Sequence, residues 1–370
     1  MAVFTIDNIK TKISKFKDKL VFIPELLEFC SENNCSDLYI KVGDYPYINR
    51  YGRILRVPCL PINTKIWNEF ANIAISSERN AEYVRGKMLD FAFTIPIPED
   101  SEYYNRFDEF RYRVSSGYSG NKNIATFRMI TPELPSFSKL NFPDQIVEKL
   151  ELSFRKRSGI IILAGPTGSG KTTTLAASIN DFTKKGKPLD NSMIITLEDP
   201  CEYIYESTNS VKINQKELGV DFKSFGLGVK QSLREHPNMI LCGEIRDKEV
   251  ISTTIEAART GHLVSTTLHS DSVAGTVSRL AYYLQDSGTD MMYDLIINLN
   301  FILAQRISAI GTRFLLDTQY MFFTDSITKH LLDMVDQNKN ITRTINALFT
   351  DENLVKSGVV KDWDKTSKEI

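Results

Sequence analysis

The stretch of residues 158–181 constrains this chain more than any other part of its sequence. It reads SGIIILAGPTGSGKTTTLAASIND, with an apolar run typical of a buried strand, a glycine-rich loop, and a helical segment that begins at Lys171. The loop matches G-x-x-x-x-G-K-[ST], and it stands in the strand–loop–helix context that a phosphate-binding loop requires. The sequence therefore predicts a nucleotide-binding core of the α/β class.

The residue types in this loop suit a polyphosphate. Glycines let the backbone curl so that successive N–H groups point inward, and the N-terminus of the following helix adds a partial positive charge. Lys171 is expected to reach the β- and γ-phosphates, and the Thr172 hydroxyl is expected to ligate Mg2+. The predicted nucleotide-binding residues are Gly165, Pro166, Thr167, Gly168, Ser169, Gly170, Lys171, Thr172 and Thr173.

Length and composition narrow the class of protein. The 370 residues suffice for two domains or one large domain, and 45 Lys and Arg against 46 Asp and Glu leave a formal net charge of -1. This balance argues against an electrostatic nucleic-acid binder. The five cysteines are odd in number and lack C-x-x-C spacing, which favours reduced thiols in a cytosolic protein. Neither a signal-peptide pattern nor an apolar run of ~20 residues is present, so we expect any membrane role to come through partners.

The first part of the chain, up to about residue 130, predicts a small α+β domain with a mostly antiparallel sheet. Residues 1–20 favour a short amphipathic helix or a loose arm, and further helices are expected at residues 24–33 and 64–77. Strands are expected at residues 37–42, 46–49, 53–57, 89–95, 109–115 and 123–129. The acidic, tyrosine-rich residues 98–108 indicate a surface loop.

Periodicity stops in the stretch TPELPSFS, which predicts a linker around Pro132 and Pro135. Strands expected at residues 159–164, 193–197, 239–242 and 263–267 then alternate with helices expected at 171–182, 222–235 and 248–259. This alternation is typical of a parallel sheet covered by helices. Beyond Arg306 we expect a strand at 314–323 and helices at 326–335 and 342–349, and the polar last ten residues are expected to be frayed.

Carboxylates follow two of the predicted buried strands. Glu198, Asp199 and Glu202 come directly after the strand at 193–197, and functional groups gather at the carboxyl ends of parallel strands. Such a group suits Mg2+ coordination and water activation, although an acidic turn is the alternative. The apolar strand at 239–242 leads to Glu244, which resembles a Walker B acid and is a candidate metal ligand.

Histidines and arginines supply further candidates. His262 and His269 bracket the strand at 263–267, and a neutral histidine can sense a γ-phosphate. The alternative is that both are merely satisfied at the two strand ends. Arg111 and Arg113 share one face of a strand, and arginine often supplies positive charge in trans to phosphoryl transfer. For these residues and Arg128, a solvated sheet edge is the other interpretation.

Taken together, these motifs resemble the secretion ATPases of the PilT and VirB type. GPTGSGKTTTLAASI is similar to the Walker A segment of that family, and ITLEDPCEY is similar to its Asp box. SLREHPNMILCGEIRD resembles the Walker B segment, and ARTGHLVSTTLHSDS resembles the His box. Ala304-Gln305-Arg306 resembles a further short motif. RYRVSS and TFRMITP are similar to the two N-domain strands whose arginines reach the nucleotide.

The resemblance implies a RecA-like P-loop ATPase core with a helical C-terminal extension at residues 141–370. A PAS-like domain at residues 1–133 would precede it, with a hinge near 131–140. ATP and Mg2+ are the implied cofactors. Glu202 would be the general base, and Glu244 would act on Mg2+ mostly through water. His262 and His269 would form the His-box pair, and the N-domain arginines would be Arg113 and Arg128.

The resemblance further implies a cytoplasmic homohexamer that works on inner-membrane secretion components, without inserting into the membrane or binding nucleic acid itself. The longer insertion before RYRVSS is more similar to the Dot/Icm-type (DotB) and IncI-plasmid conjugation ATPases than to pilus-retraction motors. We therefore favour type IVB secretion or conjugation over pilus retraction. A nucleotide-gated docking subunit remains an alternative. A small-molecule kinase is disfavoured because no arginine-rich lid follows the core, and a GTPase because N-K-x-D is missing.

Overall fold

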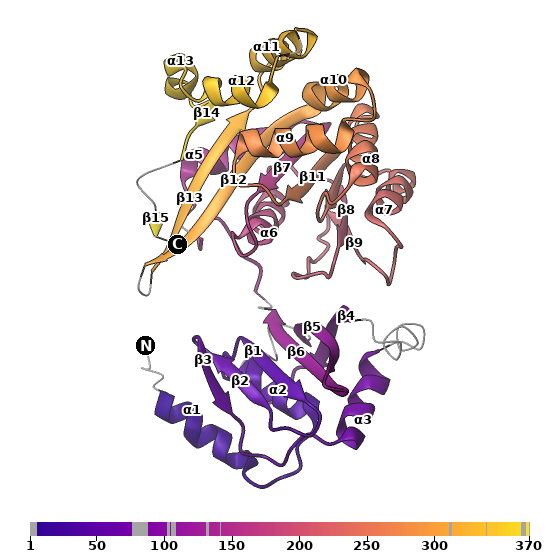
Figure 1. Cartoon of the computed structure of the whole chain (residues 1–370), viewed down its shortest axis with the longest axis vertical. Coiled ribbons are helices and arrows are strands. Elements are labelled where there is room, and N and C mark those ends of the chain that lie inside the picture. Colours follow the sequence, from indigo (N-terminus) through magenta and orange to yellow (C-terminus); the bar gives the residue numbers. More distant parts are fainter. Residues whose placement is uncertain are drawn as a thin grey trace. The chain divides into compact units, whose positions relative to one another are not determined.

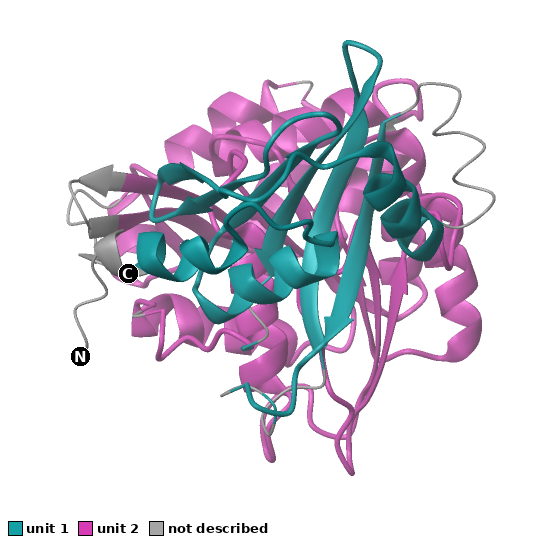
Figure 2. Ribbon diagram, turned by 90° about the horizontal axis from the view of Figure 1, so that it is seen from below, with its two compact units in different colours: residues 1–133 teal, residues 134–370 magenta. Residues whose placement is uncertain are grey.

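The structure is a computed structural model that describes residues 6–75, 88–101, 104, 109–130, 133–140, 142–310, 313–337, 339–363 and 368–369. The chain divides into two compact units, residues 1–133 and 134–370 (Figure 2). Each unit has its own sheet and its own hydrophobic core. Among the described residues, no helix is both long enough and apolar enough to cross a bilayer.

The first unit contains a six-stranded antiparallel sheet in the order β3-β2-β1-β6-β5-β4 (Figure 1). Its strands are β1 (Asp37–Lys41), β2 (Tyr47–Arg50), β3 (Arg53–Arg56), β4 (Leu89–Pro96), β5 (Glu109–Ser119) and β6 (Lys122–Ile130). Its helices are α1 (Ile6–Ile13), the 3-10 turn η1 (Ser14–Phe16), α2 (Ile23–Glu32) and α3 (Thr64–Ala74). The predicted α+β class is confirmed. The end of the helix expected at 64–77 and most of the loop expected at 98–108 lie outside the described residues.

Aromatic side chains fill the core of the first unit. Phe127 on β6 is 0% exposed, and its ring centroid lies 5.2 Å from that of Phe70 on α3. Trp67, one turn earlier on the same helix, lies 5.7 Å from Phe70. The Asn63 side chain caps this helix by accepting a hydrogen bond of 3.0 Å from the Ile66 amide. These contacts hold α3 against the sheet.

The second unit is built on a nine-stranded sheet with the order β14-β13-β12-β7-β11-β10-β8-β9, and β15 pairs with β13. Its strands are β7 (Gly159–Ala164), β8 (Met193–Glu198), β9 (Lys212–Glu217), β10 (Met239–Cys242), β11 (Leu263–Leu268), β12 (Leu299–Ile310), β13 (Arg313–Phe322), β14 (Val360–Lys361) and β15 (Lys368–Glu369). The run from β12 to β9 is parallel, whereas β13, β14 and β15 are antiparallel additions. This is the expected RecA-like core, with the loop-bearing strand β7 between β11 and β12.

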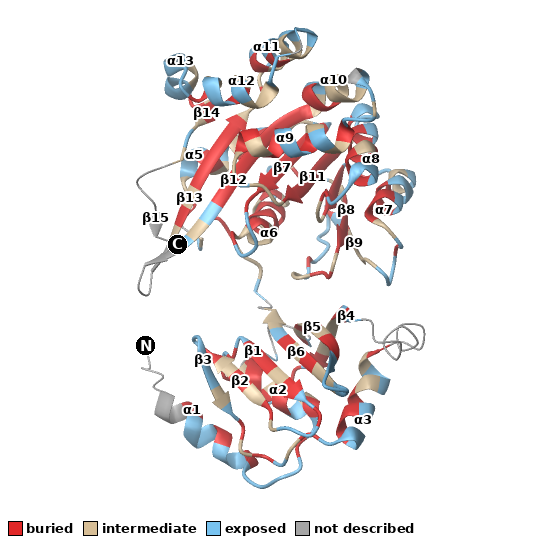
Figure 3. Ribbon diagram, in the orientation of Figure 1, coloured by how far each residue is buried: buried red, intermediate tan, exposed pale blue. Residues whose placement is uncertain are grey.

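Helices cover both faces of this sheet. They are α5 (Asp144–Phe154), α6 (Lys171–Phe182), α7 (Phe225–Ser232) with η2 (Leu233–Glu235), α8 (Lys248–Arg259), α9 (Val273–Leu284), α10 (Thr289–Asn298), α11 (Asp325–Asp336), α12 (Ile341–Leu348) and α13 (Glu352–Lys356). Alternate residues of β7 enter two different cores. Ile161 and Leu163 pack with α5 and α6, whereas Ile160 and Ile162 pack with α7 to α12. Figure 3 shows the central strands as buried.

Several predictions about the second unit are wrong in detail. The helix expected at 222–235 begins at Phe225, because Ser224 caps it by accepting a hydrogen bond from the Leu227 amide. The expected linker is anchored on the second unit, because Phe137 is buried and its amide donates to Asp181 at 2.8 Å. Further elements of the second unit were not predicted from the sequence, among them α5, α9, α10, β9 and β12.

The expectation that the polar last ten residues are frayed is also wrong in part. Lys361, expected to be frayed, pairs with Tyr320 in the ladder of β13 and β14. Trp363 lies two residues further on and is partly buried against the core of the second unit. A tail of this composition carries no periodic signal, so its docking was not visible in the sequence. Residues 364–367 and 370 lie outside the described residues.

We expect Phe127→Ala to lower the free energy of unfolding of the first unit by about 3–5 kcal/mol, because it leaves a cavity among aromatic rings. The measurement is urea unfolding of a Trp363→Phe chain, in which Trp67 is the sole tryptophan. The Phe70 ring lies between Trp67 and Phe127 and contacts both. Ile54→Ala on the edge strand β3 is the control, because Ile54 is 63% exposed. Equal losses in the two variants would contradict this account of the core.

Candidate functional site

The phosphate-binding loop connects β7 to α6 and requires glycine at three positions. Gly165, Gly168 and Gly170 have φ values of +154°, +78° and +82°, where other residues are strained. At Gly165 a Cβ atom would also lie 2.4 Å from the backbone oxygen of Gln305, closer than atoms can approach. The backbone of the loop therefore depends both on glycine and on the neighbouring strand β12.

Gln305 braces the loop through its side chain. It is 1% exposed, and its Nε2 atom donates a hydrogen bond of 2.5 Å to the Ser169 carbonyl. Its Oε1 atom accepts a hydrogen bond of 3.1 Å from the Thr174 hydroxyl in the first turn of α6. The side chain thus ties together β12, the loop and the helix that follows. The sequence analysis noted Gln305 only as part of a short motif, and the structure gives it this supporting role.

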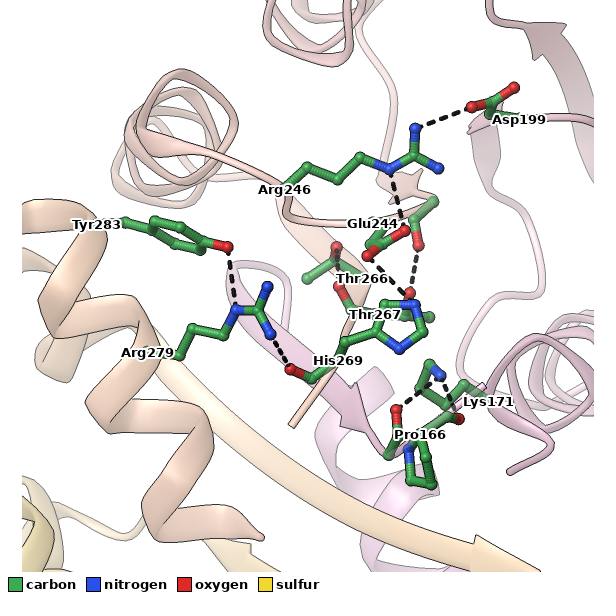
Figure 4. Close-up of polar contacts among 12 residues, drawn as sticks. Pro166, Lys171, Asp199, Glu244, Arg246, Thr266, Thr267, His269, Arg279 and Tyr283 are labelled. Carbon is green, nitrogen blue, oxygen red and sulfur yellow. Dashed lines mark hydrogen bonds and ion pairs between the residues drawn. The ribbon is translucent and has the colours of Figure 1, made fainter. Parts of the chain in front are cut away.

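Lys171 is the buried cation of the loop. Its Nζ atom donates to the carbonyls of Gly165 and Pro166, both at 2.9 Å (Figure 4). Burial lowers the pKa of Lys171, and the charges of Glu244 and Glu202 partly oppose that shift. Two carboxylates from different strand ends therefore lie close enough to act electrostatically on this ammonium group.

Glu244 follows β10 and is the centre of a polar network (Figure 4). Arg246 forms ion pairs of 3.0 Å with Glu244 and with Asp199. Partial burial lowers the pKa of Arg246, but these two ion pairs outweigh it and raise the pKa above its ordinary value. On the other side, His269 Nε2 lies 3.4 Å from the Glu244 carboxylate. Glu244 is thus held between the Arg246 guanidinium and the His269 imidazole.

The three predicted carboxylates at the carboxyl end of β8 have separate surroundings. Glu198 is buried, and it accepts hydrogen bonds from the Thr196 hydroxyl at 2.7 Å and from Gln215 at 3.2 Å. The expectation that all three carboxylates suit metal and water chemistry is therefore wrong for Glu198. Asp199 pairs with Arg246, which leaves Glu202 as the member whose charge acts on Lys171.

Tyr203 docks this acidic segment onto the loop helix. Its hydroxyl lies 3.2 Å from that of Thr173, in the first turn of α6. Gln215 on β9 donates a hydrogen bond of 2.8 Å to the Tyr203 carbonyl. Glu202 is therefore fixed between a buried strand and the helix that begins at Lys171.

The two predicted histidines lie at opposite ends of β11. His269 follows the carboxyl end of the strand, beside the loop, whereas His262 precedes its first residue. A six-residue strand is about 20 Å long, so His262 does not reach the phosphate-binding loop at the other end. Its Nδ1 atom lies 3.2 Å from the Ala257 carbonyl instead. The two histidines thus bracket the strand as the sequence predicts, although the resemblance groups them as one His-box pair.

Arg279 is a neighbour of His269 that the sequence analysis missed. From α9 it donates a hydrogen bond of 2.5 Å to the His269 carbonyl and one of 3.0 Å to the Tyr283 hydroxyl (Figure 4). It therefore fixes the backbone of the residue that faces Glu244. The arginine stands ten positions after His269, and no motif considered in the sequence joined the two residues.

The predicted arginines of the first unit lie together on its sheet. Arg113 on β5 is directly opposite Arg128 on β6. Both strands are interior, so neither arginine lies on an edge strand of the sheet. Arg128 is 71% exposed, and its Nε atom donates at 2.9 Å to Asp37, which is only 5% exposed. Asp37, which the sequence analysis did not select, thus holds one arginine beside another.

The donor set also fits Mg2+. Thr172 is the second residue of α6, and the Glu244 carboxylate is close enough to influence Lys171. Mg2+ binds through one or two protein oxygens together with substrate phosphates, so a hydroxyl and a carboxylate suffice. Among the described residues, no group of three or more His, Cys, Asp or Glu side chains is placed to hold a metal by itself.

Comparisons with known proteins agree with this architecture. Residues 96–317 match the family described as type II/IV secretion system protein. The type IV pilus ATPase PilU of Pseudomonas aeruginosa is 30% identical over 76% of this chain and 69% of its own. The solved Legionella pneumophila ATPase DotB is 26% identical with a TM-score of 0.78, and the match covers 94% of this chain and 96% of DotB. The pilus retraction motor PilT with bound ADP is 28% identical with a TM-score of 0.71, covering 90% and 94%.

Gln305→Ala is expected to weaken ADP binding about tenfold, because it removes two hydrogen bonds that brace the loop, each worth about 0.5–1.5 kcal/mol. The measurement is titration of the full chain with ADP and Mg2+. Gln337→Ala, at the exposed end of α11, is the matched control and should bind ADP normally. Unchanged affinity in Gln305→Ala would show that the loop keeps its conformation without this brace.

Proposed function

Because this chain belongs to the type II/IV secretion system protein family and is an ATPase, we propose that it powers a type IVB or conjugation-like secretion system as a homohexamer. The observation that carries the proposal is the convergence of Glu202 and Glu244 on Lys171, with His269 against Glu244. This set contains a phosphate-binding cation, a metal-directed carboxylate and a second carboxylate for water. Such a combination serves hydrolysis of a nucleoside triphosphate.

Each residue then has a role in hydrolysis. The loop amides of residues 165–173 cradle the phosphates, and Lys171 transfers its hydrogen bonds from loop carbonyls to the β- and γ-phosphates. Glu202 orients a water molecule in line with the γ-phosphorus and accepts its proton as the new P–O bond forms. ADP is the leaving group. His269 contacts the γ-phosphate and couples its binding to the position of the Glu244 carboxylate.

Mg2+ would neutralise charge that develops on the phosphate oxygens, held by Thr172 directly and by Glu244 mostly through water. Arg246 and Asp199 support this role because they fix the Glu244 carboxylate from the side opposite His269. The two carboxylates therefore have different proposed roles, with Glu244 paired to Arg246 beside the metal and Glu202 assigned to the attacking water.

The proposed motor uses both units. Arg113 and Arg128 would contribute positive charge from the first unit to a bound nucleotide, and loss of the γ-phosphate would release that unit. The cross-strand pairing of Arg113 and Arg128 supports the proposal because it places two guanidinium side chains on one part of the sheet. The ion pair with Asp37 orients Arg128 and offsets part of its charge. In a ring, repeated closure and release would transmit work to inner-membrane secretion components at the cytoplasmic face.

Pilus retraction is the second candidate function. PilU and the ADP-bound PilT structure are both similar to this chain, which favours it. Against it stands the match to DotB, whose TM-score of 0.78 exceeds the 0.71 of PilT. Replacing chromosomal Glu202 by Gln in the host separates the two functions. Type IVB activity predicts loss of substrate transfer with surface pili still retracting, whereas loss of pilus retraction alone would favour the second function.

Glu202→Gln is expected to lower kcat for ATP at least 100-fold, because a general base contributes about 10²–10⁴ in rate. The measurement is ATP turnover per subunit against protein concentration, with the mass in solution determined on the same samples. Turnover should rise as hexamers form. Glu206→Gln, an exposed carboxylate four residues further on, is the control and should keep full activity. A constant rate from monomers would contradict the ring, and full activity in Glu202→Gln would contradict the assigned base.

A further inference from the structure

The loop that follows β11 is held from three directions. The carbonyl of its first residue, His269, accepts a hydrogen bond from Arg279 as described above. Two residues later, the Asp271 carbonyl accepts a hydrogen bond of 2.8 Å from Arg306 on β12. The amide of Val273, the first residue of α9, donates at 2.9 Å to the buried Gln319 of β13. The path of residues 269–273, and hence the direction of the His269 side chain, depends on these contacts.

Two of the three contacts are themselves held by the C-terminal tail. Trp363 stacks on Arg306, with the guanidinium carbon 3.9 Å from the centroid of the indole ring. Asp362 accepts a hydrogen bond of 2.8 Å from the Nε2 atom of Gln319. The tail is attached to the sheet just before these residues, through the ladder of β13 and β14. Two consecutive tail residues, Asp362 and Trp363, therefore contact the two side chains, Gln319 and Arg306, that hold the loop carrying His269.

Arg306 and Gln305 are neighbours on β12, and their contacts lie in different directions. Gln305 reaches the Ser169 carbonyl and α6, whereas Arg306 reaches Asp271 and the tail. Successive strand residues point to opposite faces of a sheet, so the two supports act on different parts of the site. Loosening the tail would disturb the His269 loop and leave the brace of the phosphate loop in place.

We propose that Trp363 and Asp362 are positioning residues of the ATPase site, and that residues 360–363 form a strap that sets His269 against Glu244 through Arg306 and Gln319. The inference rests on the proposed role of His269 in hydrolysis. A strap of this kind acts on the chemical step and not on nucleotide affinity, because it supports the loop after β11 and not the phosphate cradle. It also gives any partner that binds the tail a direct route to the rate of ATP turnover.

The test uses the full chain with Trp363→Ala, and Trp363→Phe as the conservative variant. The stacking contact at an exposed site predicts a fall in kcat of about threefold with KM and ADP affinity unchanged. The double change Asp362→Ala with Trp363→Ala should lower kcat further, to about a tenth. Trp363→Phe should stay near the wild-type rate. Val355→Ala, on exposed α13 in the same C-terminal region, is the control for general perturbation of the tail.

Two measurements separate a positioning role from a merely structural one. Amide hydrogen exchange over residues 269–275 should be faster in Trp363→Ala, and unchanged in Trp363→Phe and Val355→Ala. The double variant Arg306→Ala with Trp363→Ala should have the same kcat as Arg306→Ala alone, because Trp363 acts through Arg306. Unchanged exchange, an additive double variant, or a rise in KM with kcat intact would each overturn the strap.

The same experiment distinguishes failure of the strap from failure of the proposed function. Lys171→Ala is measured beside the wild type, and turnover that does not depend on Lys171 would contradict the assigned site. In that case the exchange measurement still decides the strap, since it needs no turnover. Lys171-dependent turnover with no effect of Trp363→Ala would overturn the strap alone.

Discussion

The close approach of β12 to the phosphate loop is the constraint on which the rest of the site depends. A Cβ atom at Gly165 would collide with the Gln305 backbone, and the Gln305 side chain binds both the loop and α6. These contacts fix where α6 begins, and therefore where Lys171 and Thr172 lie. The carboxylates of β8 and β10 reach the same place only because parallel strands end at one edge of the sheet.

Electrostatic balance follows from this geometry. Lys171 is buried enough for its pKa to fall, and the opposing charges of Glu244 and Glu202 help to keep it cationic. Glu244 also has a second cation, Arg246, with which it forms an ion pair of 3.0 Å. An incoming γ-phosphate would enter a site whose cation already has partners on its own loop, and those partners are neutral carbonyls that phosphate oxygens readily replace.

The sequence was sufficient where local pattern and function coincide. The strand at 159–164, the glycine-rich turn after it and the helix that begins at Lys171 were predicted correctly, because a phosphate-binding loop leaves little freedom to its backbone. It was insufficient where tertiary contacts decide. Gln305 stands about 140 residues after the loop, and only strand order brings the two together. The docking of Phe137 and Trp363 shows that one aromatic residue can anchor a segment that otherwise reads as linker or tail.

The central claim is that one nucleotide site in the second unit brings Lys171, Glu202, Glu244 and His269 around the γ-phosphate. A structure determined with Mg2+ and a non-hydrolysable ATP analogue tests it most directly. The account predicts that Lys171 leaves the carbonyls of Gly165 and Pro166 for the phosphates, and that Glu202 lies within hydrogen-bond distance of a water in line with the γ-phosphorus. An analogue bound elsewhere, or a Glu202 carboxylate turned away from that water, would contradict the account.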